Sequence, residues 1–185
     1  MSDVVCFMLE PTIKFQRNLR RFVFNSKQQI PCEDKNYHNA VALTDDIIEM
    51  PNFKWAGDGT QPWDHADIRW PKTCKHCGYA FKESDEWQHN LERLWRKVGT
   101  DEEYTIKNAP SGAMWYADWG TWPGPDGKSL YVKLPDGVEW CIDGLATNSD
   151  KPWSRTGVPP TITARPSILT SNYHGFLTDG ILRSC

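Results

Sequence analysis

The chain has 185 residues, of which 39% are hydrophobic, and it carries a formal net charge of −3 with a pI near 5.9. This acidic balance argues against a protein that coats nucleic acid by bulk charge, and no apolar run is long enough to cross a membrane as a helix. Ten Trp, seven Phe and six Tyr supply enough apolar area for a buried core, which excludes a disordered tail.

The length fits one domain over residues 1–185, which we divide into a metal-binding half at 1–99 and a β-rich half at 100–185. The N-terminus has no basic leader, and its apolar stretch is too short for a secretory signal peptide. Six Cys could form three disulfides, but thiols and a metal fit better where no secretory signal is found. We therefore expect a soluble protein made in a reducing cytoplasm, without a membrane partner.

The first predicted element is a buried strand over residues 3–10, which are apolar and end at Pro11. Residues 13–24 fit two structures. Apolar residues at i, i+4 and i+7 favour a short amphipathic helix, whereas the run Phe22-Val23-Phe24 favours a strand.

The clearest predicted helix covers residues 84–99. Ser84 can cap its N-terminus, acidic residues follow in the first turn, and Gly99 can end it. Apolar residues recur within it at helical spacing and form one stripe: Trp87, Leu91, Leu94, Trp95 and Val98.

The last third of the chain predicts strands. Residues 130–134 and 138–143 alternate around Pro135-Asp136-Gly137, and two strands joined by a short turn with Gly form a hairpin. Three shorter strands are expected at 161–163, 167–169 and 175–177.

Cys74 and Cys77 form the strongest chemical motif, in the sequence Thr-Cys-Lys-His-Cys-Gly-Tyr. Two thiolates three residues apart on a tight turn can reach one zinc ion, and the Gly lets the backbone fold over it, as in a zinc knuckle. The alternatives are a redox pair, whose usual helix-opening setting is absent here, and two buried thiols without a ligand.

A tetrahedral zinc needs two more ligands. The nearest spaced pair is Cys32 and His38, which gives the predicted set Cys32, His38, Cys74 and Cys77. Four protein ligands would close the site and make it structural rather than catalytic. Three other histidines compete for a place in the set: His65, His76 and His89.

With this zinc site, the predicted fold class is α+β: a small antiparallel sheet with one main helix and extensive irregular, zinc-stapled loops. Metal binding adds directly to the folding free energy of a small domain that has much irregular backbone.

Two further groups of residues have a functional and a structural interpretation. His174, Asp143 and Arg155 could perform acid–base catalysis, although Asp-Gly and His-Gly pairs are also common in turns. A basic cluster could bind nucleic-acid phosphates, although such a run is usually a solvated face: Lys14, Arg17, Arg20 and Arg21.

Several long motifs occur in a fixed order, among them Tyr-His-Asn-Ala at 37–40, Cys-x-x-Cys-Gly-Tyr-Ala-Phe at 74–81 and Tyr-His-Gly-Phe-Leu-Thr-Asp-Gly at 173–180. In these motifs the chain resembles a group of uncharacterised proteins carried by tailed bacteriophages and prophages. The resemblance implies that a Cys and a Tyr-His before the knuckle complete the metal set, which corresponds to Cys32 and His38. It also makes His174, in the last of these motifs, a candidate functional residue and not only a turn residue.

The resemblance does not extend to a second metal site, because this chain lacks the cysteines that the phage proteins have between the Ile-Asp-Gly and Tyr-His-Gly motifs. We expect a phage-encoded zinc-binding viral protein that acts by binding a phage or host protein, in the virion or the host cytoplasm. The alternatives are a small enzyme built on His174, Asp143 and Arg155, and a nucleic-acid-binding protein that uses the basic cluster.

Overall fold

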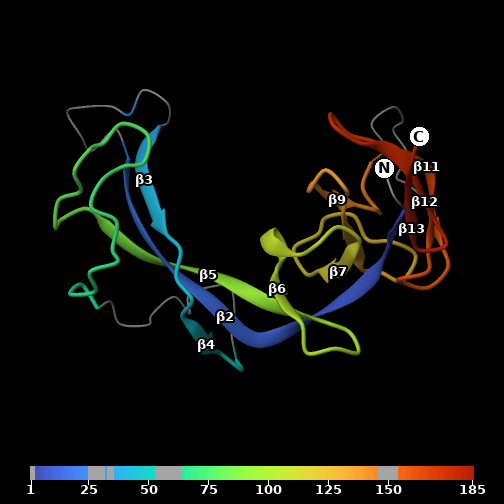
Figure 1. Ribbon diagram of the computed structural model, residues 1–185, viewed down its shortest axis with the longest axis horizontal. Coiled ribbons are helices and arrows are strands. Elements are labelled where there is room, and N and C mark those ends of the chain that lie inside the picture. Colours follow the sequence, from blue (N-terminus) through green and yellow to red (C-terminus); the bar gives the residue numbers. More distant parts are fainter. Residues whose placement is uncertain (1–2, 25–31, 33–35, 53–63, 146–153) are drawn as a thin grey trace. The chain divides into compact units, whose positions relative to one another are not determined.

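The computed structural model describes residues 3–24, 32, 36–52, 64–145 and 154–185 (Figure 1). Among these residues the chain forms strands joined by turns, and the one helical element is a short 3-10 helix, η2 (Ile106–Asn108). No helix in the described part of the chain is long and apolar enough to span a membrane.

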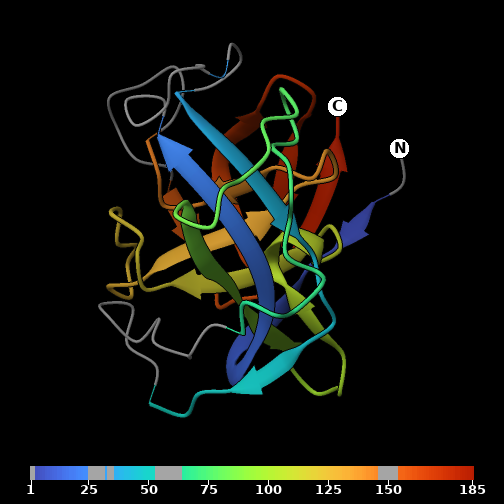
Figure 2. The ribbon, with the colours of Figure 1, turned by 90° about the vertical axis from the view of Figure 1, so that its left-hand side faces the viewer.

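In the described part of the chain, thirteen strands pair in two sheets. Figure 2 shows the ribbon turned by 90° from Figure 1. One sheet has the order β1-β13-β12-β11-β10, and the other has the order β6-β5-β2-β7-β8-β9, with β3 and β4 also pairing with β2. The bounds are β1 (Val4–Val5), β2 (Phe7–Phe24), β3 (Tyr37–Ala42), β4 (Ile47–Glu49), β5 (Glu86–Lys97), β6 (Glu103–Thr105), β7 (Ala113–Ala117), β8 (Ser129–Lys133), β9 (Glu139–Cys141), β10 (Ser154–Thr156), β11 (Thr163–Leu169), β12 (His174–Thr178) and β13 (Ile181–Ser184).

The predicted α+β fold with one main helix is wrong, because the segment assigned to that helix is strand β5. Its side chains contact β2 in the order expected for antiparallel neighbours. The Thr12 hydroxyl donates to the Leu94 carbonyl, the Arg93 guanidinium lies 5.0 Å from the Phe15 ring centroid, and the Arg21 guanidinium lies 3.5 Å from that of Trp87. Pairing with a long neighbouring strand therefore outweighs the helical spacing of the apolar residues.

The N-terminal strand is longer than predicted. Pro11 does not end it, and β2 continues to Phe24, so the strand alternative for residues 13–24 is correct and the helical one is wrong. The hairpin of β8 and β9 is confirmed. Leu134 and Val138 close its turn, where the Leu134 N–H donates to the Val138 carbonyl over 2.9 Å.

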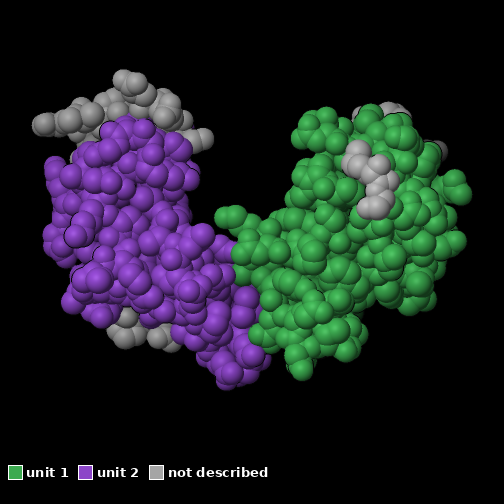
Figure 3. Space-filling view, in the orientation of Figure 1, with its two compact units in different colours: residues 1–11, 95–185 green, residues 12–94 purple. Residues whose placement is uncertain are grey.

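The chain divides into two compact units, coloured in Figure 3. Unit 1 comprises Met1–Pro11 and Trp95–Cys185, and unit 2 comprises Thr12–Leu94. The core of unit 1 is built from the inner faces of its strands, with Met114, Trp115 and Leu130 fully buried.

Unit 2 buries the apolar face of the second part of β2. Phe15 and Leu19 are almost completely inaccessible, and Phe22 and Val23 are buried near the strand's end. The register Phe22↔Asn39 to Leu19↔Ala42 places β3 along this part of β2. The core of unit 2 thus depends on one strand and on the strands that pair with it.

We expect Phe15→Ala to destabilise unit 2 by about 3–5 kcal/mol, since it removes a fully buried aromatic ring and leaves a cavity. Phe24→Ala, on the same strand but with 47% of the residue exposed, should cost about 1 kcal/mol or less. Denaturant unfolding of both variants measures the difference. Equal losses would contradict the assignment of Phe15 to the core.

Candidate metal centre

Three thiols and one imidazole meet in unit 2, from the four residues Cys32, His38, Cys74 and Cys77. One ligand atom from each residue lies within 4.8 Å of the ligand atoms of the other three, and His38 Nδ1 is 3.2 Å from Cys77 Sγ. Ligands of a tetrahedral zinc stand about 3.5 Å apart, given metal–ligand bonds of about 2.0–2.3 Å. The pair His38 Nδ1 and Cys77 Sγ is close to that spacing, and the limit of 4.8 Å for the whole cluster is somewhat wider.

A tight turn brings Cys74 and Cys77 to one side. Thr73 and Ala80 form an antiparallel bridge, the Cys74 N–H donates to the Tyr79 carbonyl, and the Gly78 N–H donates back to the Cys74 carbonyl over 3.0 Å. Gly78 has φ +74°, a conformation that favours glycine and that the turn requires to close.

Strand β3 supplies the imidazole. His38 pairs in register with Val23 of β2, and its side chain is fully buried, on the same face of β3 as Ala40. The neighbouring residue joins the knuckle to the strand, since Asn39 accepts a hydrogen bond from the Lys75 N–H and donates its own N–H toward Cys74 Sγ, 3.4 Å away.

Backbone hydrogen bonds around Cys74 favour the ionised form of its thiol. Burial raises its pKa, but backbone N–H groups of His76, Asn39 and Cys77 point at the sulfur and together lower the pKa to about 6. A thiolate is the form that binds metal, so the backbone of the turn favours the ligand state of this sulfur near neutral pH.

A second layer of contacts orients the imidazole. The His38 ring stacks on Tyr79 with centroids 4.2 Å apart and an interplanar angle of 22°. The Tyr79 hydroxyl donates to Asp85 Oδ2, which also accepts the Lys82 N–H over 2.8 Å. Such outer contacts hold a ligating histidine in one orientation.

The competing histidines are placed elsewhere. His65 stacks on Trp87, with ring centroids 4.4 Å apart, and its Nδ1 lies 3.5 Å from a carboxylate oxygen of Glu83. His76 is exposed within the turn, and the side chain of His89 lies outside the described part of the structure. The cluster found among the described residues is the predicted set of four.

Asp143 and Arg155 form a buried ion pair in unit 1. Arg155 Nε donates to Asp143 Oδ1 over 2.7 Å, and Asp143 Oδ2 accepts the Leu130 N–H over 2.9 Å. Both side chains are 3% exposed or less, which leaves no access for a substrate. His174 is exposed and contacts Ser167, and no contact among the described residues joins it to the pair.

The basic cluster lies on β2, and its arginines are engaged within unit 2. Arg17 pairs with Asp46 over 2.7 Å, and Arg20 donates to the side chain of Asn39 over 2.8 Å. Arg21 is buried, donates to the Lys82 carbonyl and stacks over Trp87. The fourth member, Lys14, is half-buried and also has an interaction partner. Nucleic-acid binding through these residues remains a prediction, which salt-sensitive retention on DNA would test.

The sequence did not indicate Asn39 and Tyr79, although both support the metal ligands directly. One signal could have pointed to Asn39, which follows the ligand His38 in the Tyr-His-Asn-Ala motif. For Tyr79 the signal is its position two residues after Cys77, where the knuckle turn closes and the Tyr79 carbonyl accepts the Cys74 N–H.

Comparison of the chain with models of protein families, with curated proteins and with solved structures gives no match. Function is therefore inferred from the geometry and chemistry of the residues themselves.

We expect Arg155→Met to destabilise unit 1 by about 3–5 kcal/mol, because it leaves the buried Asp143 carboxylate without its counter-charge. Adding Asp143→Asn should restore part of this loss. Arg183→Met is the matched control, since Arg183 forms an exposed ion pair with Asp3 in the same unit and should cost about 1 kcal/mol or less. Urea unfolding measures these three variants and Asp143→Asn alone, and a double variant as unstable as the sum of its two single variants would contradict the pairing.

Asp126 gives unit 1 a pH-dependent stability. Burial raises the pKa of its carboxyl, but hydrogen bonds from the Tyr116 hydroxyl, Arg155 and the Lys128 N–H lower the pKa to about 2. The unfolded-state pKa is about 4, so the stabilisation is complete above about pH 4 and is lost as the pH falls toward 2. Asp126→Asn should flatten the free energy of unfolding in that interval, and a slope equal to that of the unmodified chain would refute the assignment.

Proposed function

We propose that the chain is a zinc protein in which Cys32, His38, Cys74 and Cys77 form a closed structural site, and that it acts by binding another protein. The observation that supports the metal is the convergence of four ligand atoms within 4.8 Å from three separate segments of unit 2. Three thiolates and one imidazole match the ligand preference of zinc, and hard cations such as Mg²⁺ and Ca²⁺ prefer oxygen.

A set of four protein ligands favours a structural over a catalytic metal. Tetrahedral zinc with four protein ligands has no position for water or substrate, and three of the four residues are buried, the fourth being Cys77. The candidate acid–base residues also favour a non-catalytic role, since Asp143 and Arg155 satisfy each other inside unit 1. The resemblance to phage and prophage proteins makes a phage or host protein the partner to test first.

Metal analysis and cobalt substitution test the site directly. Purified protein should contain about one zinc per chain, and Co²⁺ exchange should give the intense visible bands of a tetrahedral ion together with thiolate-to-cobalt charge transfer. Cys77→Ser should lower that charge transfer to about two thirds, because two of three thiolates remain. Cys185→Ser, which changes another exposed cysteine, should leave the spectrum unchanged.

The same cobalt protein separates a structural from a catalytic metal. Azide or cyanide binds to an open position and shifts the visible bands, whereas a closed four-ligand site leaves them unchanged. Azide-dependent shifts would contradict the structural role, and weak octahedral bands would contradict the ligand set. Removal of the metal by a chelator should lower the thermal stability of the protein, because metal binding contributes to folding.

A further inference from the structure

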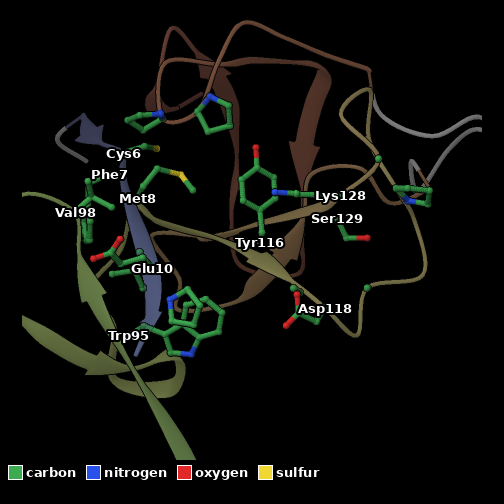
Figure 4. A pocket seen from close by; sticks show the side chains of 18 residues that line it. Cys6, Phe7, Met8, Glu10, Trp95, Val98, Tyr116, Asp118, Lys128 and Ser129 are labelled. Atoms are coloured by element: carbon green, nitrogen blue, oxygen red, sulfur yellow. The ribbon is translucent and has the colours of Figure 1, made fainter. Parts of the chain in front are cut away.

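Unit 1 contains an open cavity of about 850 Å³ (Figure 4). All eighteen lining residues belong to residues 1–11 or 95–185, and none is a metal ligand or one of the sequence-predicted catalytic candidates. Cavities of roughly 300–1,000 Å³ are the size class that binds small ligands and short peptide segments.

Flat apolar side chains dominate its surface. Figure 4 shows Met8 and Glu10 of β2 on one side, Tyr116 and Lys128 on the other, and Trp95 beneath. The lining also includes four prolines, at positions 11, 123, 159 and 160. Trp119, half exposed, packs edge-on against Trp95 with ring centroids 6.4 Å apart and extends the aromatic surface outward.

The lining offers little strand edge to which a peptide could add. The strands that contribute to it are β2, β5, β7 and β8, and each has a neighbour on both sides in the sheet order, although the register of β2 with β7 covers only Phe7 and Met8. Side-chain packing and individual hydrogen bonds are therefore the main means of recognising an extended ligand. Polyproline II peptides bind in this way, on aromatic-lined grooves, because their conformation needs no backbone ladder.

Two charged side chains of the lining are exposed and lie outside ion pairs in the described part of the chain: Asp118 and Lys128. The Lys128 ammonium lies 5.1 Å from the centroid of the Tyr116 ring. The ammonium suits a peptide carbonyl, and the carboxylate suits a cation. Trp95 lies in the core beneath the cavity and is only 4% exposed.

The Asp118 carboxylate is the feature that suits a basic ligand. The charged residues of the lining are Glu10, Asp118 and Lys128. Glu10 forms an ion pair with Arg96, whose Nη2 lies 2.7 Å from Oε1, so the charge of Glu10 is already neutralised. A saccharide would require many more free polar groups around its hydroxyls than Asp118 and Lys128 supply.

We infer that this cavity binds a proline-containing segment of a partner protein in the polyproline II conformation, with an adjacent Arg or Lys that pairs with Asp118. The inference rests on the proposed function, since it specifies the chemistry of the bound partner. Prolines pack on the partly exposed rings of Tyr116 and Trp119 and have no N–H that would need an acceptor, and a carbonyl of the segment accepts from the Lys128 ammonium.

Fluorescence anisotropy with the zinc-loaded full chain tests the inference. The probe is a fluorescein-labelled proline-rich peptide with one terminal arginine, and two control peptides replace its prolines with alanine or its arginine with glutamate. We expect the first peptide to bind, and each control to bind at least about tenfold more weakly. Asp118→Lys should weaken the arginine peptide about tenfold and strengthen the glutamate peptide.

Two further variants separate recognition from folding. Asp101→Lys makes the same charge change at an exposed aspartate outside the cavity and should leave both affinities unchanged. Trp119→Ala removes a half-exposed ring beside the cavity, and should weaken the arginine peptide about three- to tenfold with little change in thermal unfolding.

The outcomes are distinct. Equal binding of the proline and alanine peptides, an Asp118→Lys variant with unchanged preference, or displacement by a saccharide and not by peptide would each overturn the inference. Zinc content and the cobalt spectrum are measured on the same preparation. Intact zinc without peptide binding therefore refutes the cavity assignment alone, and peptide binding without zinc refutes the proposed metal site alone.

Discussion

The hydrogen bonding of β2 is the constraint on which the rest of the structure depends. An extended strand of 18 residues presents backbone donors and acceptors along its whole length, and buried backbone groups must find partners. Four strands meet this requirement, with β7 parallel to its first residues and β3 and β4 antiparallel to its later ones, and with β5 also beside it. The alternation of side chains on β2 then determines what each unit buries.

Pairing with β2 also explains where the functional groups lie within each unit. In unit 2 the register places His38 opposite Val23 and turns its ring to the buried face, where the knuckle meets it. In unit 1 the segment from Phe7 to Glu10 forms one wall of the cavity while Leu9 enters the core. One strand thus positions a candidate metal ligand and one wall of a cavity, although neither site contains residues of the other unit.

The sequence predicted local chemistry better than it predicted long-range pairing. The cysteine spacing and the nearest Cys and His were enough to name the four residues that converge, because a tight turn and a tetrahedral ion impose local rules. The hairpin of β8 and β9 follows from its Pro-Asp-Gly turn in the same way. Residues 84–99 carry local helix signals, yet the partner that makes them a strand lies about seventy residues earlier in the sequence, and no spacing rule reveals it.

The cavity could not be predicted for a related reason. Its lining joins residues 6–11 with single residues and short runs between Trp95 and Pro160, and each looks ordinary in its own segment. The contacts of Asp143 and Arg155 could not be predicted either. Their polar character suggested catalysis, which remains a prediction, and the structure shows the two charges joined between β8 and β10, through the Leu130 N–H and the Arg155 side chain.

A bound metal would stabilise the fold of a unit such as residues 12–94, because it would offset conformational entropy lost by its turns. Much of the described part between β3 and β5 is turns, and fixing each residue costs about 1–2 kcal/mol of conformational entropy. An ion that joins His38 to Cys74 closes a span of 36 residues (74 − 38), and a covalent cross-link over such a span is worth roughly 3–4 kcal/mol. The proposed zinc would give an equivalent constraint without a disulfide, through three thiolates and an imidazole.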